Sequence, residues 1–214
     1  MKTFLLLLLA FVLGFGGVAG YQYFRTKQEA PVVVTPAVQP TPEPTFALVP
    51  PSQAVSGILT VTTGHAQKFS RNDTEYKEAS IGAQILLGES VATRENSSAT
   101  ASVSGIVTVS MGPSAELVFA NLFPTDFVLQ QKSGKIEYLV TQPISVRALH
   151  TLVTIGSGDT IINIIDTDMS ITVKTGSVKF ALVDNDNNTN VWDVQAGERA
   201  NIDDVTRQVY LIQP

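Results

Sequence analysis

From residue 52 onward, apolar and polar residues alternate in short runs, and turn-forming residues interrupt these runs every eight to twelve positions. Each run predicts a half-buried β-strand, because alternate side chains of a strand point to the same face. The runs are rich in Thr, Ser, Val and Ile, whose branched side chains suit a pleated sheet. The predicted strands are 58–61, 84–87, 99–103, 106–111, 116–119, 135–140, 145–149, 152–155, 160–165, 170–175, 177–183, 189–194 and 208–212. We therefore expect residues 52–214 to form one all-β domain of short antiparallel or solenoid-like strands, arranged as a roll or a sandwich.

The first 24 residues have a different pattern, in which apolar residues are continuous rather than alternating. Residues 4–24 contain no charged side chain, and as a helix they would span roughly 31 Å, close to the ~30 Å hydrocarbon core of a membrane. Tyr21 and Tyr23 stand where interfacial aromatic residues occur, and Arg25 and Lys27 follow them. This pattern predicts a transmembrane signal-anchor helix at residues 4–24, within an N-terminal anchor segment 1–24.

A cleaved signal peptide is the alternative interpretation of the same segment. Lys2 would supply its basic start, residues 4–13 its apolar core and residues 18–20 its small-residue cleavage site. The length and the aromatic residues favour the uncleaved anchor. Both interpretations place the following residues outside the cytoplasm if the N-terminus stays inside, so we expect a single-pass cell-membrane protein with an extracytoplasmic C-terminal domain.

Residues 25–51 predict an extended linker. Seven of the eleven prolines lie between Pro31 and Pro51, and this density favours polyproline II and excludes a helix. Fully extended, the segment could reach roughly 80 Å. No two of these prolines are three positions apart, so the PxxP pattern of SH3 ligands is missing, and we interpret the segment as a spacer.

Composition excludes several classes of function. The chain has no Cys, which removes disulfides, cysteine-based zinc sites, a cysteine nucleophile and a lipid-modified Cys anchor. Fourteen Lys and Arg against nineteen Asp and Glu give a net charge of −5, so a basic nucleic-acid-binding surface is not expected. The two histidines, His65 and His150, are interpreted as a turn residue and a strand residue rather than as catalytic groups.

Three short motifs resemble functional sites but favour structural interpretations. Residues 156–161 begin like a dinucleotide-binding loop, lack its third glycine and following helix, and predict a β-turn. Residues 166–168 read Asp-Thr-Asp where an aspartic protease has Asp-Thr-Gly. Asp184, Asp186 and Asn188 are spaced like calcium ligands, but the sixth and twelfth positions of the loop do not fit, so we expect a hairpin loop.

Five glycines mark the expected turns of the domain. Gly88, Gly105, Gly134, Gly176 and Gly197 each lie between two apolar runs. A tight turn at such a position requires a positive φ angle, which glycine adopts without strain.

The order of these motifs resembles the FecR-type domain of bacterial envelope proteins. The similarity rests on residues 81–93, which carry a glycine, apolar pair, glycine, acid pattern, and on the segments 111–117, 129–136, 171–178 and 194–199. It covers roughly residues 55–202 and weakens at residues 155–162. The resemblance implies a scaffold that acts through protein contacts. Some family members regulate an iron-uptake sigma factor through a cytoplasmic N-terminal region, but only three residues precede the predicted anchor here, which argues against that role.

We therefore expect a non-catalytic, membrane-tethered envelope protein that displays a FecR-like β-domain for protein interaction or signalling. A carbohydrate- or cell-wall-binding module on a stalk is the alternative, and an enzyme is the third hypothesis. No catalytic, cofactor-binding or metal-ligating residue is assigned, and no cofactor is expected. The expected partners are the membrane, through residues 4–24, and an envelope protein; a cell-wall polymer is a further candidate partner, and nucleic acid is excluded.

Overall fold

The computed structural model describes residues 21, 23, 53–70 and 72–213. The chain divides into two units, Met1–Val49 and Pro50–Pro214. The predicted anchor, apart from Tyr21 and Tyr23, and the predicted linker lie outside the described residues. In the described part of the chain, no helix is long and apolar enough to cross a membrane.

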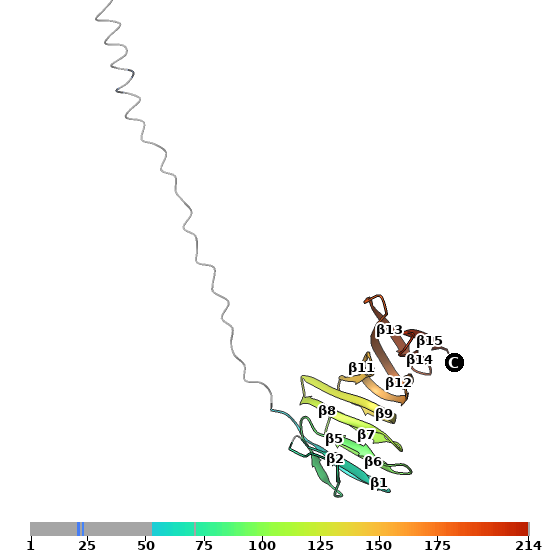
Figure 1. Cartoon of the computed structure of the whole chain (residues 1–214). Helices are drawn as coiled ribbons and strands as arrows, with labels where there is room; N and C mark the ends of the chain where they lie inside the picture. Colours follow the sequence, from blue (N-terminus) through green and yellow to red (C-terminus); the bar gives the residue numbers. More distant parts are fainter. Residues whose placement is uncertain (1–20, 22, 24–52, 71, 214) are drawn as a thin grey trace, which may run out of the picture. The chain divides into compact units, whose positions relative to one another are not determined.

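Residues 53–213, where described, form a β-domain of fifteen strands (Figure 1). In chain order they are β1 (Gly57–Thr63), β2 (Ala66–Phe69), β3 (Lys77–Glu78), β4 (Ala83–Ile85), β5 (Ser90–Thr93), β6 (Ser98–Val103), β7 (Val107–Met111), β8 (Glu116–Phe123), β9 (Asp126–Val140), β10 (Ile144–Ala148), β11 (Thr151–Ile165), β12 (Asp168–Val183), β13 (Thr189–Gln195), β14 (Arg199–Asp203) and β15 (Gln208–Ile212). The all-β prediction is confirmed for these residues.

The strands form one continuous hydrogen-bonded sheet that folds over into two layers. The layer that ends in β15 has the order β15–β14–β12–β11–β9–β7–β6–β1–β4, and we call it the β15 layer. The layer that ends in β13 has the order β13–β12–β11–β10–β9–β8–β5–β2–β3, and we call it the β13 layer. Since no helix covers either face within residues 53–213, the side chains buried on one layer are covered by the other layer.

The strands β9, β11 and β12 belong to both layers, because each bends and pairs with different neighbours in its two halves. Residues 128–131 of β9 pair with β10, whereas residues 136–140 pair with β7. Residues 151–155 of β11 pair with β10, whereas residues 158–164 pair with the second half of β9. The three bends therefore connect the two layers.

Side-chain burial changes phase at each bend. In β9 the buried positions are odd-numbered up to Gln131 and even-numbered from Ile136, with an exposed or half-buried stretch between them. β11 and β12 show the same odd-to-even change around residues 156–159 and 174–177. An extra residue in a strand, as in a β-bulge, shifts the alternation by one position, and the pairing of β11 with β12 is irregular at these residues, between Ile155 and Gly158 and between Asp159 and Thr160.

A buried glutamine fixes the bend of β9. Gln131 is 1% exposed, and its amide nitrogen donates to the carbonyl oxygens of Gly134, at 2.7 Å, and Ile162, at 3.1 Å. Its side-chain oxygen accepts a 2.9 Å hydrogen bond from the hydroxyl of Tyr138. The polar side chain is thus fully engaged inside the core, as a buried amide requires.

The bends correct part of the sequence-based prediction. Residues 152–155 and 160–165 are one strand rather than two, and so are residues 170–175 and 177–183. Gly134, Gly176 and the segment 156–158 therefore lie inside bent strands, not in turns between strands. The strands are antiparallel, except that β9 and β10 run parallel. Sequence reasoning also missed β2, β3, β5, β14 and the first half of β9.

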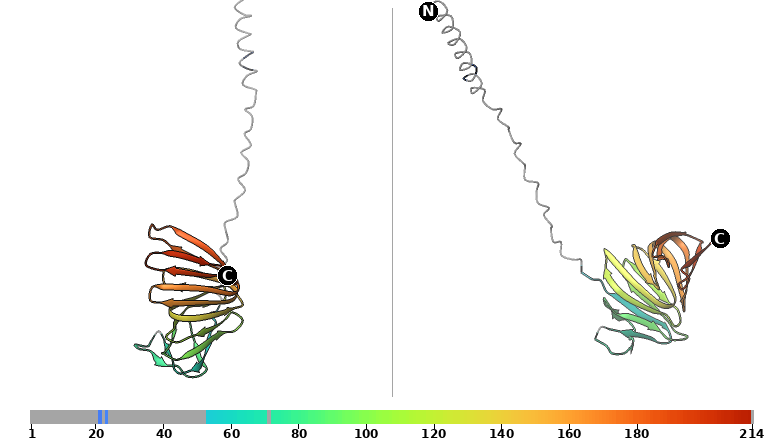
Figure 2. Two further views of the ribbon diagram at one scale, coloured as in Figure 1. Left: turned by 90° about the vertical axis from the view of Figure 1, so that its right-hand side faces the viewer. Right: turned by 45° about the horizontal axis from the view of Figure 1, so that its top comes forward.

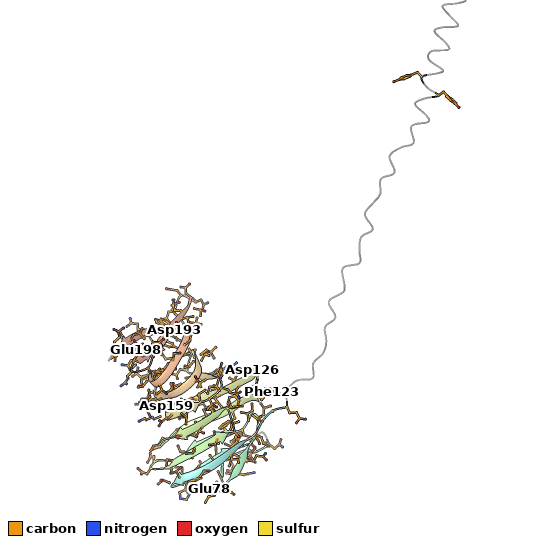
Figure 3. The ribbon with its side chains drawn as sticks, turned by 180° about the vertical axis from the view of Figure 1, so that it is seen from behind. Glu78, Phe123, Asp126, Asp159, Asp193 and Glu198 are labelled. Atoms are coloured by element: carbon orange, nitrogen blue, oxygen red, sulfur yellow. The ribbon has the colours of Figure 1, made fainter. Side chains whose placement is uncertain are left out.

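The domain has two distinct ends. Figure 2 shows the strands as a stack that runs from β1 and β2 to the C-terminal strands. Seen from behind, Asp193 of β13 and Glu198, next to β14, lie at the C-terminal end, and Glu78 of β3 lies at the opposite end (Figure 3).

Candidate functional site at the C-terminal edge

The last strand, β15, forms an open edge of the β15 layer. Within the described residues it pairs only with β14. Three consecutive large apolar side chains on it are exposed, namely Tyr210 by 57%, Leu211 by 51% and Ile212 by 47%. The strand has no proline or charged residue, and these are features that commonly prevent an edge strand from pairing with another chain.

A short connection sets the position of β15. Asp203, at the end of β14, accepts hydrogen bonds on its carboxylate from the backbone amides of Val205, at 2.9 Å, and Thr206, at 3.0 Å. These hydrogen bonds, foremost the one from the backbone of Thr206, lower the pKa of Asp203 below its usual value. Arg207 then adopts a φ of 58° and directs the chain back along β14.

The same connection is attached to a neighbouring turn through Asp204, whose side chain is 10% exposed. Its carboxylate accepts from the backbone amide of His150 at 3.2 Å and lies 2.8 Å from the ring nitrogen Nδ1 of His150. The guanidinium of Arg207 lies 3.3 Å from the same carboxylate. His150 therefore lies in the turn between β10 and β11, not in the strand that the sequence predicted, and it helps to hold the β14–β15 hairpin in place.

Beside the edge, the outer face of the β15 layer is hollowed. The hollow has a volume of about 410 Å³ and is formed by residues of β11, β12, β14 and β15. We call it the C-terminal groove. Its lining includes Asn163, Ile165, Asp168, Ser170, Arg199, Asn201, Asp203 and Tyr210. Sequence reasoning assigned no role to this set, because its members come from four strands that only the fold brings together.

Residues 184–188, which include the three side chains spaced like calcium ligands, form a hairpin loop, as the sequence predicted. Val183 and Thr189 pair across its base. One carboxylate oxygen of Asp184 accepts from the backbone amides of Asp186, at 3.0 Å, and Asn188, at 2.8 Å. These contacts, with the hydrogen bond from the Asn188 backbone as the main cause, lower the pKa of Asp184. The loop's own donors therefore occupy the carboxylate that would have been its first ligand.

The other sequence candidates do not assemble into a chemical site. Residues 156–161 lie inside β11 at its bend, where a β-turn was predicted. Asp166 lies in the tight β11–β12 turn with a φ of 54°. His65 lies in the connection between β1 and β2, where its ring nitrogen is 3.6 Å from Glu78. In the part of the chain that the structure describes, no three His, Cys, Asp or Glu side chains come close enough to hold a metal ion.

Glu89, the acidic residue of the motif at residues 81–93, has a structural role. Glu89 is 6% exposed, and its carboxylate accepts from the backbone amide of Leu86 at 2.8 Å and from the ammonium of Lys68 at 3.2 Å. The hydroxyl of Ser70 also donates to it. Burial alone would raise the pKa of Glu89, but these hydrogen bonds outweigh it and lower the pKa. Glu89 thus joins β2 to the turn between β4 and β5.

Comparison with known proteins shows a shared fold. Two crystal structures of a candidate anti-sigma factor from Parabacteroides distasonis ATCC 8503, at 2.50 and 1.65 Å resolution, superpose on this chain with a TM-score of 0.51 each. Their sequence identities to it are 14% and 12%, over 58% of this chain and 59% of theirs. The chain thus matches about three fifths of the length of these relatives. No protein-family model matches the sequence, and no curated protein does.

Proposed function

We propose that this protein is a membrane-tethered, extracytoplasmic protein that displays its β-domain for protein interaction in envelope signalling, without catalytic activity. The apolar segment at residues 4–24 and the proline-rich segment 25–51 support tethering on a spacer. The fold shared with a candidate bacterial anti-sigma factor supports a signalling context. The buried carboxylates of Glu89 and Asp204 support a non-catalytic role, since both hold strands and turns together.

The open edge of β15 is the observation that carries the interaction proposal. An extended segment of a partner envelope protein would add to β15 as a further strand, because the edge offers main-chain hydrogen-bonding groups. The exposed Tyr210, Leu211 and Ile212 would provide side-chain contacts on both faces of the added strand. Three adjacent exposed apolar side chains are costly in a solvated surface strand unless a partner covers them.

Site-specific photocrosslinking in native membranes tests this proposal. A photoreactive amino acid would replace Leu211 in the full chain, and a matched control would carry it at Leu139. Leu139 has a similar exposure, 53% against 51% for Leu211, but lies on the inner strand β9. We expect a discrete protein adduct at Leu211 and none at Leu139.

Peptide mapping and a binding measurement complete the test. The crosslinked segment of the partner, made as a synthetic peptide, should bind the full chain. A Leu211→Lys substitution should weaken that binding, because a lysine on an edge strand disfavours pairing. A Leu139→Lys substitution should leave it unchanged. No adduct at Leu211, or equal weakening by both substitutions, would overturn the proposal.

A further inference from the structure

The C-terminal groove has a regular polar floor, because cross-strand pairing places its side chains in rows. Asn163, Ser170, Asn201 and Tyr210 are successive partners across β11, β12, β14 and β15. In each of β11, β12 and β14 the residues on either side of this row are buried, so the row itself points outward. The result is a line of amide, hydroxyl and phenol groups on the outer face of the β15 layer.

Several of these polar groups have no partner within the described residues. The side chains of Asn163, Ser170 and Asp168 make no hydrogen bond there, although all three line the groove. Arg199 donates through Nε to the side-chain oxygen of Asn201 at 2.8 Å. Its guanidinium forms no ion pair in the described part of the chain, so its remaining donors are available. The groove therefore presents both donors and acceptors that a ligand could engage.

Two exposed apolar side chains border this polar floor. Tyr210, on β15, is 57% exposed, and Ile165, on β11, is 63% exposed. Both line the groove from opposite sides, because β12 and β14 lie between their strands. An exposed aromatic ring offers a flat apolar face with a polar tip. A fitting ligand therefore combines several hydroxyl or amide groups with an apolar ring face.

The charges of the groove disfavour an anionic ligand. Asp168 and Asp203 are direct cross-strand partners, so their carboxylates lie next to each other on the same face. The single cationic side chain among the lining residues is Arg199. With two carboxylates and one guanidinium, the groove has a net negative charge that would repel phosphate-rich or sulfated polymers. An uncharged ligand is not repelled.

We propose that the C-terminal groove binds an uncharged pyranose oligosaccharide. Asn163, Ser170 and Arg199 would hydrogen-bond its hydroxyl or amide substituents, and one sugar ring would pack against Tyr210. This activity is separate from the proposed protein interaction, although Tyr210 belongs to both the groove and the β15 edge. The residues on β11 and β12 belong to the groove alone, and substitutions there separate the two proposals.

Calorimetric titration of the purified full chain in detergent micelles tests the groove. The probes are chitotetraose, which carries N-acetyl groups, cellotetraose, which lacks them, and polyglutamate as an anionic control. We expect saturable binding of at least one of the two sugars and none of polyglutamate. Binding of chitotetraose alone would assign an N-acetylated glycan, and binding of cellotetraose would assign a plain glucan.

Variants locate the binding to the groove. The double substitution Asn163→Ala and Ser170→Ala should weaken sugar binding by about tenfold or more, since each net hydrogen bond contributes roughly fivefold. The matched control, Thr100→Ala with Ser110→Ala, removes a cross-strand pair of polar side chains from β6 and β7 of the same layer and should have no effect. Tyr210→Phe keeps the ring and should retain most binding, whereas Tyr210→Ala should lose it.

Three results would overturn the proposal. They are no binding of either sugar, equal weakening by the groove variant and its control, and polyglutamate binding as tight as sugar binding. Because the crosslinking test at Leu211 does not depend on Asn163 or Ser170, failure here would leave the protein-interaction proposal standing, and the reverse also holds.

Discussion

At the scale of single residues, glycine determines where the domain can bend. The sequence predicted a positive φ at all five marked glycines, and the structure confirms it, with values of 81° for Gly88, 72° for Gly105, 78° for Gly134, 82° for Gly176 and 90° for Gly197. The expected turns were wrong at Gly134 and Gly176, which lie in bends inside β9 and β12, because a bend and a turn need the same positive φ. The change of burial phase after Gln131 is the signal that could have distinguished them.

Substitution of Gly176 by Ala should destabilise the domain by about 3 kcal/mol or more. A Cβ atom there would lie 2.0 Å from the carbonyl oxygen of Ser157 on β11, so the paired strands must separate in addition to the φ strain. Gly156→Ala is the control, because that position lies in the same bend and has open space around it. Denaturant unfolding, followed by the fluorescence of the single tryptophan, Trp192, measures the stability of both variants. Equal stabilities would contradict the prediction.

Two buried threonines should respond in opposite directions to replacement by Val. The hydroxyl of Thr160 is buried and has no hydrogen-bond partner, so Thr160→Val should stabilise the domain by about 1 kcal/mol. The hydroxyl of Thr93 donates to the carbonyl of Gly112 at 2.6 Å and accepts from the amide of Ala115 at 2.9 Å. Thr93→Val should therefore destabilise it by about 1–3 kcal/mol. Thermal unfolding distinguishes the two, and a loss of stability in Thr160→Val would show that its hydroxyl is satisfied.

At the scale of strands and turns, most of the longer alternating runs were predictable, whereas several short strands and the first half of β9 were not. The runs at 99–103 and 208–212 were expected and occur as β6 and β15. β3 has only two residues, and β5 does not alternate, since Ser90, Val91 and Thr93 are all buried. β14 follows directly on the Ala-Gly-Glu turn and begins with the charged Arg199. Its sequence therefore favours a loop between strands rather than a strand. The groove could not be predicted, since strand register alone brings its rows together.

Glu89, in the turn before β5, should make the stability of the folded domain depend on pH. Because its hydrogen bonds lower the pKa of Glu89 in the folded domain below the ordinary value of 4.5, the carboxylate contributes stability above about pH 4.5. That contribution is lost as pH falls through the lowered pKa. Glu89→Gln should therefore be less stable than the wild type at pH 7, and the difference should shrink toward pH 3.

Chemical unfolding of both proteins at several pH values measures this difference. Asp73, Glu137, Asp184 and Asp203 also have lowered pKa values, so the wild type and the variant share the rest of the acid dependence. A difference that stays constant from pH 7 to pH 3 would show that the Glu89 carboxylate is not held in its charged form.

At the scale of the whole molecule, the all-β class and the expectation of a roll or a sandwich followed from the alternation of residues along the chain, whereas the strands that connect the two layers could not be predicted from it. The long strands β9, β11 and β12 join the layers, and the expected boundaries inside β11 and β12 concealed this continuity. The N-terminal anchor stays a prediction from the uninterrupted apolar segment at residues 4–24.

Protease accessibility should show the β-domain outside the cytoplasm. Protease added to intact spheroplasts should digest a C-terminal tag on the full chain while a cytoplasmic marker protein stays intact. The physical reason is the 21-residue uncharged segment 4–24, which is long enough to span the membrane as a helix. A protected tag, or a mature chain that begins at Tyr21, would contradict an uncleaved anchor with an exported domain.

Hydrogen exchange on the full chain tests the central claim, that a partner segment adds to the open edge at β15, most directly. The exchange of backbone amides would be compared with and without the partner peptide identified by crosslinking at Leu211. We predict slower exchange in Gln208–Ile212 and unchanged exchange in Ala83–Ile85, the strand at the opposite edge of the same layer. Unchanged exchange in β15, or equal slowing in both edge strands, would contradict the account.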